Sequence, residues 1–123
     1  MLGDNFDTRE CGDMGAMFNC CEMPKGFTLN EQFVTTKVWN MSFMFTKAHL
    51  PDGFKFSTHF SPSSANVLGM FAGTTFAPSF RLNREFDIAN SPSAAGIFNG
   101  CEYGVGIKTY FDAKAKVVML REE

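Results

Sequence analysis

Six side chains in this sequence could carry nucleophilic or metal chemistry: Cys11, Cys20, Cys21, Cys101, His49 and His59. The cysteine spacing lacks the paired knuckles of a structural zinc site, and two histidines are too few for a histidine-rich metal site. A triad of Cys101, His59 and Asp87 meets the requirement for a nucleophile, a base and an orienting carboxylate, but no local signature supports it. We therefore expect a protein that is not an enzyme, with no catalytic residue, no metal and no cofactor.

The cysteines are expected to be reduced thiols that act as small buried hydrophobic side chains, because no secretory signal is recognised. A disulfide from Cys20 or Cys21 to Cys101 is the alternative for a protein that ends up outside a cell. Acidic residues also recur at every third position near the N-terminus: Asp4, Asp7, Glu10 and Asp13. They lack the ligand pattern and central glycine of a calcium-binding loop, so a solvated acidic segment is expected.

One phrase occurs twice, as "SPSSANVLGMFAG" (61–73) and "SPSAAGIFNG" (91–100), and the copies align when 66–68 are removed. Serine before proline is typical of a helix start, so each copy is predicted to hold at most a short helix with Ser61 or Ser91 as its cap. We interpret the copies as similar crossover loops. Chance and a pair of anion-binding helix N-termini are the alternatives, although no glycine-rich cradle with a lysine supports phosphate.

The elements that must position these groups are predicted to be strands. From Phe27 onward apolar residues alternate with a period of two, as in "KVWNMSFMF" (37–45), where Trp39, Met41, Phe43 and Phe45 would share one face. The stretch "FKFSTHF" (54–60) would turn Phe54, Phe56, Thr58 and Phe60 inward, and "LPDGF" between the two predicts a hairpin turn. Further strands are expected in "CEYGVGIKTYF" (101–111) and "VVMLREE" (117–123).

About seven or eight such strands predict an all-β fold, an antiparallel β-sandwich, jelly roll or barrel, with roughly 35% or more of the residues in strands and under about 15% in helices. Residues 27–123 would form this single β domain. Gly104 and Gly106 would leave one strand face bare, which suits the close approach of a neighbouring ring, a ligand or another subunit.

Residues 1–26 are expected to form an irregular N-terminal arm, because glycine and proline interrupt any helix there. Its apolar anchors would contact a neighbouring subunit or a partner in the same assembly. The candidate interface residues are Leu2, Phe6, Met14, Met17, Phe18, Gly104 and Gly106.

Composition narrows the function further. The net charge is −2 and the basic residues are scattered, which argues against nucleic-acid binding. The sequence has neither a run long enough for a membrane span nor a recognisable signal peptide, so no membrane partner is expected and the location would be a virion or the cytoplasm. Fifteen phenylalanines and eight methionines beside the predicted arm favour a non-enzymatic structural or assembly protein that forms homo-oligomers, such as a cement, minor capsid, connector or tail component of a virus or phage. A barrel that binds an apolar small molecule in a Phe-lined cavity is the alternative.

Overall fold

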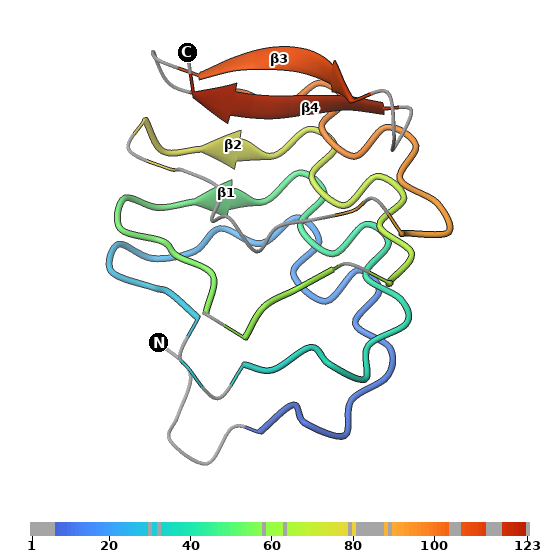
Figure 1. Ribbon diagram of the computed structural model, residues 1–123. Helices are drawn as coiled ribbons and strands as arrows, with labels where there is room; N and C mark the ends of the chain where they lie inside the picture. Colours follow the sequence, from blue (N-terminus) through green and yellow to red (C-terminus); the bar gives the residue numbers. More distant parts are fainter. Residues whose placement is uncertain are drawn as a thin grey trace.

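The chain forms a stack of coils that are paired in parallel, as seen in the computed structural model (Figure 1). The structure describes residues 7–29, 31, 33–57, 59–62, 64–78, 80, 88, 90–103, 107–112 and 117–122, the last two ranges by their backbone. The described strands are β1 (His49–Leu50), β2 (Thr75–Phe76), β3 (Ile107–Asp112) and β4 (Val117–Glu122). β1 pairs in parallel with β2, and β3 pairs antiparallel with β4. The described residues include no helix.

Successive coils are joined by backbone hydrogen bonds along one side of the stack. Four segments, here called turn segments 1 to 4, carry these bonds: residues 13–21, 40–48, 66–74 and 93–101. The N–H of Met14 donates to Asn40 O, and the N–H of Val67 donates to Ser93 O, each at 2.8 Å. The same register links segment 2 to segment 3. The N–H groups of alternate residues, counted from Met14, Met41 and Val67, therefore donate toward the C-terminal end of the stack.

Each turn segment bends at two left-handed residues that lie four positions apart. The four pairs are Ala16 and Cys20, Phe43 and Lys47, Gly69 and Gly73, and Gly96 and Gly100. Only glycine adopts this backbone conformation without a steric cost. The G-x-F-x-G spacing of the last two segments therefore fits these corners, and the first two segments reach the same shape with side chains in place.

The interior is held by ladders of phenylalanine rings, one ring per coil. The ring centroids of Phe18 and Phe45, Phe45 and Phe71, and Phe71 and Phe98 are each 5.3 Å apart, with interplanar angles of 14°, 5° and 2°. These residues lie 27, 26 and 27 positions apart in the sequence, which gives the length of one coil. Stacked aromatic pairs add stability beyond the area that they bury, so the ladder fixes each coil directly over the last.

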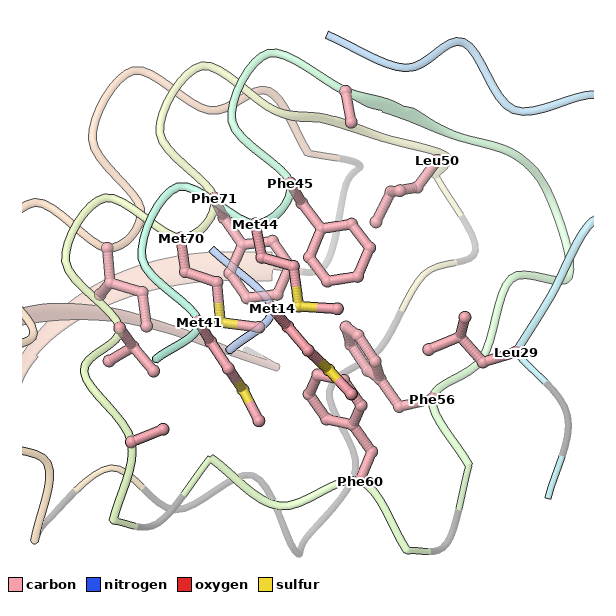
Figure 2. Packing of buried hydrophobic residues seen from close by; sticks show 14 of the residues in the cluster. Met14, Leu29, Met41, Met44, Phe45, Leu50, Phe56, Phe60, Met70 and Phe71 are labelled. Carbon is pink, nitrogen blue, oxygen red and sulfur yellow. The ribbon is translucent and has the colours of Figure 1, made fainter. Parts of the chain in front are cut away.

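Other apolar side chains fill the space around this ladder (Figure 2). Phe27 stacks on Phe54 with centroids 6.4 Å apart, and Phe33 stacks on Phe60 at 6.0 Å. A methionine group also lies inside the stack: Met14, Met41, Met44 and Met70, all fully or almost fully buried. Met is flexible enough to fill irregular gaps between rings.

Threonine hydroxyls join the coils where the backbones are too far apart to bond directly. The Thr35 hydroxyl donates to Ser61 O at 2.9 Å and accepts from Ser61 N at 2.8 Å. Thr28 forms the same pair of bonds with Lys55. Each hydroxyl thus satisfies one donor and one acceptor of the next coil, half-buried at Thr35 and exposed at Thr28.

The predicted antiparallel sandwich finds no support in the described residues, and the reason is visible in 37–45. This stretch is a turn segment, with Met44 buried, whereas Trp39 and Phe43 are exposed. The left-handed backbone of Phe43 breaks the period of two that a strand would need. Short coils with tight corners can therefore imitate strand alternation over a few residues.

Around "LPDGF" the local prediction is right and the pairing is different. Phe54 N donates to Pro51 O at 3.1 Å and Gly53 has φ 80°, which confirms the turn. The turn does not join an antiparallel hairpin, because β1 before it pairs in parallel with β2.

In "FKFSTHF", the inward placement of Phe54, Phe56 and Phe60 is confirmed by their burial. Ser57, expected outside, is buried and donates its hydroxyl to Phe33 O at 2.5 Å. Thr58 lies outside the described residues.

Of the strands expected at the C-terminus, the one predicted in 101–111 is present only from Ile107, as β3, and the one predicted in 117–123 is present as β4. β3 and β4 pair antiparallel from Ile107 with Glu122 to Asp112 with Val117. They follow the last coil at the C-terminal end of the stack (Figure 1).

The repeated phrase marks adjacent coils. Its shared glycines lie one above the other, since Gly69 N donates to Ala95 O and Gly73 N to Asn99 O. The two Ser-Pro-Ser triplets are also neighbours, because the Ser91 hydroxyl donates to Pro62 O at 3.3 Å. No helix forms in the described residues of either copy.

The described part of the expected arm, residues 7–26, lies in the first coil of the same stack. Its backbone bonds to turn segment 2, and its Met14 is 2% exposed. A search of the described residues for a helix of membrane-spanning length and apolarity finds none.

Candidate functional site

The residues that could do chemistry are spread over separate coils. All four cysteines are free. Cys21 and Cys101 hold equivalent places in turn segments 1 and 4, which are three coil steps apart. Three steps of about 4.8 Å place them on the order of 14 Å apart, whereas a disulfide needs a Cα separation below about 7 Å. The alternative of a disulfide between these two segments of one chain does not fit the stack.

The candidate triad is not assembled by the described residues. Burial raises the pKa of the Cys101 thiol to about 11, which keeps the sulfur protonated and weakly nucleophilic at neutral pH. His59 is exposed on another coil, and Asp87 lies outside the described residues. His49 is exposed at the start of β1.

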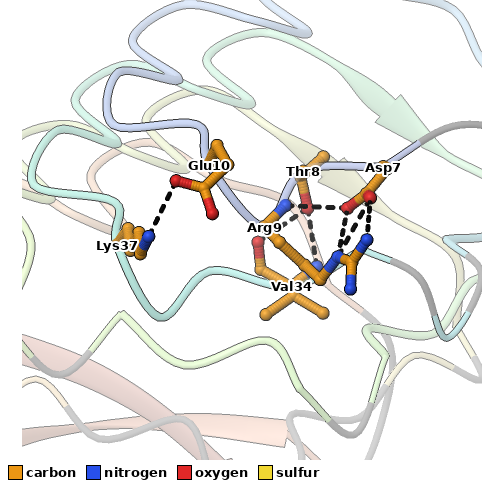
Figure 3. Close-up of polar contacts among 6 residues, drawn as sticks. All are labelled: Asp7, Thr8, Arg9, Glu10, Val34 and Lys37. Carbon is orange, nitrogen blue, oxygen red and sulfur yellow. Dashed lines mark hydrogen bonds and ion pairs between the residues drawn. The ribbon is translucent and has the colours of Figure 1, made fainter.

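The acidic residues near the N-terminus are engaged locally (Figure 3). Asp7 accepts two hydrogen bonds from Arg9 Nε and one from its Nη2, and these bonds lower the pKa of the carboxyl. Glu10 pairs with Lys37 at 2.7 Å. Asp4 lies outside the described residues, which contain no group of three potential metal ligands.

The predicted interface residues fall into three groups. Met14 is buried in the core of its own chain, and Phe18 is half-buried on the ring of Phe45. Met17 is 40% exposed. The others lie outside the described residues: Leu2, Phe6, Gly104 and Gly106.

Met17 marks an uncovered end of the stack. Its equivalents in the next two coils, Met44 and Met70, are fully buried, so Met17 is a core position that no other coil of the described residues covers. The carbonyl oxygens of Gly15, Met17 and Asn19 face the same way and accept no hydrogen bond from another described residue. We call these three carbonyls and the Met17 side chain the open end.

Two large aromatic side chains form a second exposed feature, which we call the aromatic pair. Trp39 is 62% exposed and Phe43 is 42% exposed. The Trp39 ring lies against Gly12, since a Cβ there would be 2.8 Å from Trp39 Nε1, and the Phe43 ring lies over Gly69. Both rings were expected on one strand face together with Met41 and Phe45, whereas Met41 and Phe45 are buried and the two rings are exposed.

The positions equivalent to the aromatic pair carry small or compact residues in the other coils. Beside Trp39 these are Gly12, Ala65 and Pro92, and beside Phe43 they are Ala16, Gly69 and Gly96. Large side chains at this surface are therefore particular to the coil that contains turn segment 2, here called coil 2, and the repeat does not require them. Compared with known proteins, the chain matches no family model, no curated relative and no solved structure, so its function is inferred from this geometry alone.

Proposed function

We propose that the protein is a non-enzymatic structural module that assembles with further copies of itself through the exposed surface of its coils. The observation that carries the proposal is the aromatic pair. Trp39 and Phe43 are exposed at positions where every other coil carries a small or compact residue, and Phe43 has φ 56°. A left-handed non-glycine residue costs about 1–2 kcal/mol, and Phe43 shares this conformation with Ala16, Cys20 and Lys47 at the other corners.

Aromatic side chains are the usual anchors of protein interfaces, where tryptophan above all contributes large binding energies. Coil 2 offers two of them four residues apart, Trp39 against Gly12 of the preceding coil and Phe43 against Gly69 of the following coil. A partner surface would bury both rings without moving the backbone. A particle subunit of a virus or phage, the setting expected from composition, is one assembly of this kind and stays a prediction.

The small-molecule barrel is less well supported by the geometry. The phenylalanines that would line its cavity contact one another instead, with Phe45 stacked between Phe18 and Phe71. A ligand of comparable size would have to displace one of these rings. Interiors packed in this way resemble protein cores rather than ligand cavities.

The test compares two variants in the same coil. Phe43→Gly and Lys47→Gly both relieve a left-handed residue, but only the first removes an aromatic ring. We expect self-association, measured by sedimentation velocity, to weaken at least tenfold in Phe43→Gly and to be unchanged in Lys47→Gly. Trp39 is the only tryptophan, so its emission should shift to shorter wavelength as the wild type associates.

Stoichiometric binding of a fatty acid or apolar dye by a monomer that never associates would contradict the proposal and favour the barrel. Association that leaves the Trp39 emission unchanged, and that is equally strong in Phe43→Gly, would reject the aromatic pair as the contact.

A further inference from the structure

We infer that copies of this chain stack head to tail, with the open end of one copy on the last turn segment of the next. This inference goes beyond the proposed function because it uses the two ends of the stack and not the aromatic pair. It starts from the direction of the hydrogen bonds. Along the turn segments of all three coil interfaces, alternate N–H groups, such as those of Met14, Phe43 and Gly69, donate toward the C-terminal end, and the carbonyls that accept them face the N-terminal end.

The last turn segment presents the complementary row. Val67, Gly69 and Gly73 in turn segment 3 donate their N–H groups to turn segment 4. Their equivalents one coil later are Ala94, Gly96 and Gly100. The N–H groups of these three residues donate to no other described residue, and we call them the donor row.

The register of such a contact follows from the chain's own interfaces. Gly69 N donates to Ala95 O at 3.0 Å, and Gly73 N donates to Asn99 O at 2.8 Å. Carried one coil further, Gly96 N would donate to Gly15 O of a second copy and Gly100 N to its Asn19 O. Each new bond would repeat one that the fold already makes three times.

Polarity selects this arrangement over a symmetric dimer. Two open ends that face each other would oppose carbonyl to carbonyl, and two donor rows would oppose N–H to N–H, so neither pair can form hydrogen bonds. Only the unlike ends complement each other. The contact is heterologous, and a heterologous contact that does not close gives open-ended chains.

Exposure at both ends is consistent with the contact. The exposed surface of Met17 would be covered by the second copy, as Met44 is covered within the chain. At the other end the hairpin of β3 and β4 follows the last coil (Figure 1), yet Ala95, Gly96 and Gly100 remain exposed. The two glycine corners of the donor row are therefore accessible with the hairpin in place, whereas the Ala94 side chain is buried in the core.

Two variants block one end each. Met17→Glu places a charge on the open end, with Met17→Leu as its matched control. Ala94→Pro removes an N–H that bonds to no described residue, and a missing donor is how natural edges prevent pairing. The Ala94 side chain is buried, so Ala94→Ser is the control for a change of side chain at this position. Circular dichroism and urea unfolding establish that each variant folds.

The full chain is studied by sedimentation velocity over a wide concentration range. We expect the wild type and both controls to form species that grow with concentration beyond a dimer. Met17→Glu and Ala94→Pro should each be monomeric alone. A mixture of the two leaves one intact open end and one intact donor row, so it should form dimers of one copy of each variant and nothing larger.

A wild type that stays monomeric, or a mixture that stays monomeric, overturns the inference. A blocked variant that still dimerises alone also overturns it, because it shows contact between like ends. If association persists in both blocked variants but is lost in Phe43→Gly, head-to-tail stacking fails and the proposed function stands. If the blocked variants lose association and Phe43→Gly retains it, the opposite holds.

Discussion

Replacing Gly69 by alanine tests whether the corners of the coils and the exposed ring of Phe43 are coupled. Gly69 has φ 59°, and a Cβ there would lie 2.7 Å from Phe43 Cε1 and 2.9 Å from its Cδ1. The left-handed backbone costs alanine about 1–2 kcal/mol. The ring must also move, at about 0.5–1.5 kcal/mol for a side chain forced off its rotamer. Alanine restricts the unfolded chain, which offsets roughly 0.5–1 kcal/mol.

Gly69→Ala should therefore lower the free energy of unfolding by about 1.5 kcal/mol in urea denaturation, with the slope of the transition unchanged. In a Phe43→Gly background the ring is absent and only the backbone penalty remains. The two substitutions should then show a coupling energy of about 1 kcal/mol in a double-mutant cycle.

Gly73→Ala provides the matched control. Gly73 has φ 69°, but its Cβ would meet Lys47 Cγ at 3.3 Å, part of a long flexible side chain. A cycle of Gly73→Ala with Lys47→Gly should show coupling within about 0.5 kcal/mol of zero. Additive effects at Gly69 and Phe43, or a cost of Gly69→Ala below about 0.5 kcal/mol, would show that the ring does not rest on this glycine.

Three further predictions follow from the core. Thr35→Val should cost about 1–3 kcal/mol, because it leaves a half-buried N–H and carbonyl of Ser61 without their partner. Thr28→Val, whose equivalent bonds to Lys55 are exposed, should cost under about 1 kcal/mol in the same denaturation assay. Phe71→Ala should cost about 3–5 kcal/mol, since the ring is fully buried and stacked on both faces; a thermal midpoint near that of wild type would contradict the ladder. With a thiol pKa of about 11 in the fold, Cys101 should react with iodoacetamide at pH 8.5 far more slowly than the exposed Cys20. The thiol of the unfolded chain loses its proton at lower pH than the folded one. The free energy of unfolding should therefore be constant below about pH 9 and fall between about pH 9 and 11.

Local features of the fold could be predicted from the sequence where a short-range rule decides them. The Pro51 turn with Gly53 at positive φ follows from turn chemistry, and the pairing of β3 with β4 follows from two alternating runs around a polar turn. The burial of Phe54, Phe56 and Phe60 also agrees with the pattern. In each case, residues close together in the sequence are sufficient to predict the local structure.

The stack itself depends on a longer period. Phe18, Phe45, Phe71 and Phe98 recur every 26 or 27 residues, and an internal repeat of this length is the signature of stacked architectures. The period-two interpretation overlooked it because a coil with two left-handed corners alternates buried and exposed residues over short windows. Without aligning the phenylalanines, only the last two coils can be recognised as repeats, from the shared phrase around Gly69 and Gly96. The first two coils carry non-glycine residues at the same corners.

The candidate site was missed for the same physical reason. Whether Trp39 and Phe43 point inward depends on the backbone at Phe43, and no composition rule predicts a left-handed phenylalanine. Once the register is known, the two surfaces have different origins. The aromatic pair is an addition to one coil. The open end is a consequence of the row of bonds along the turn segments, because a row whose N–H groups donate in one direction must end in carbonyls on one side and in N–H groups on the other. Such a stack can be completed at its carbonyl end only by a group that donates hydrogen bonds, and the donor row of a second copy is the one described surface that does so in the register of the fold.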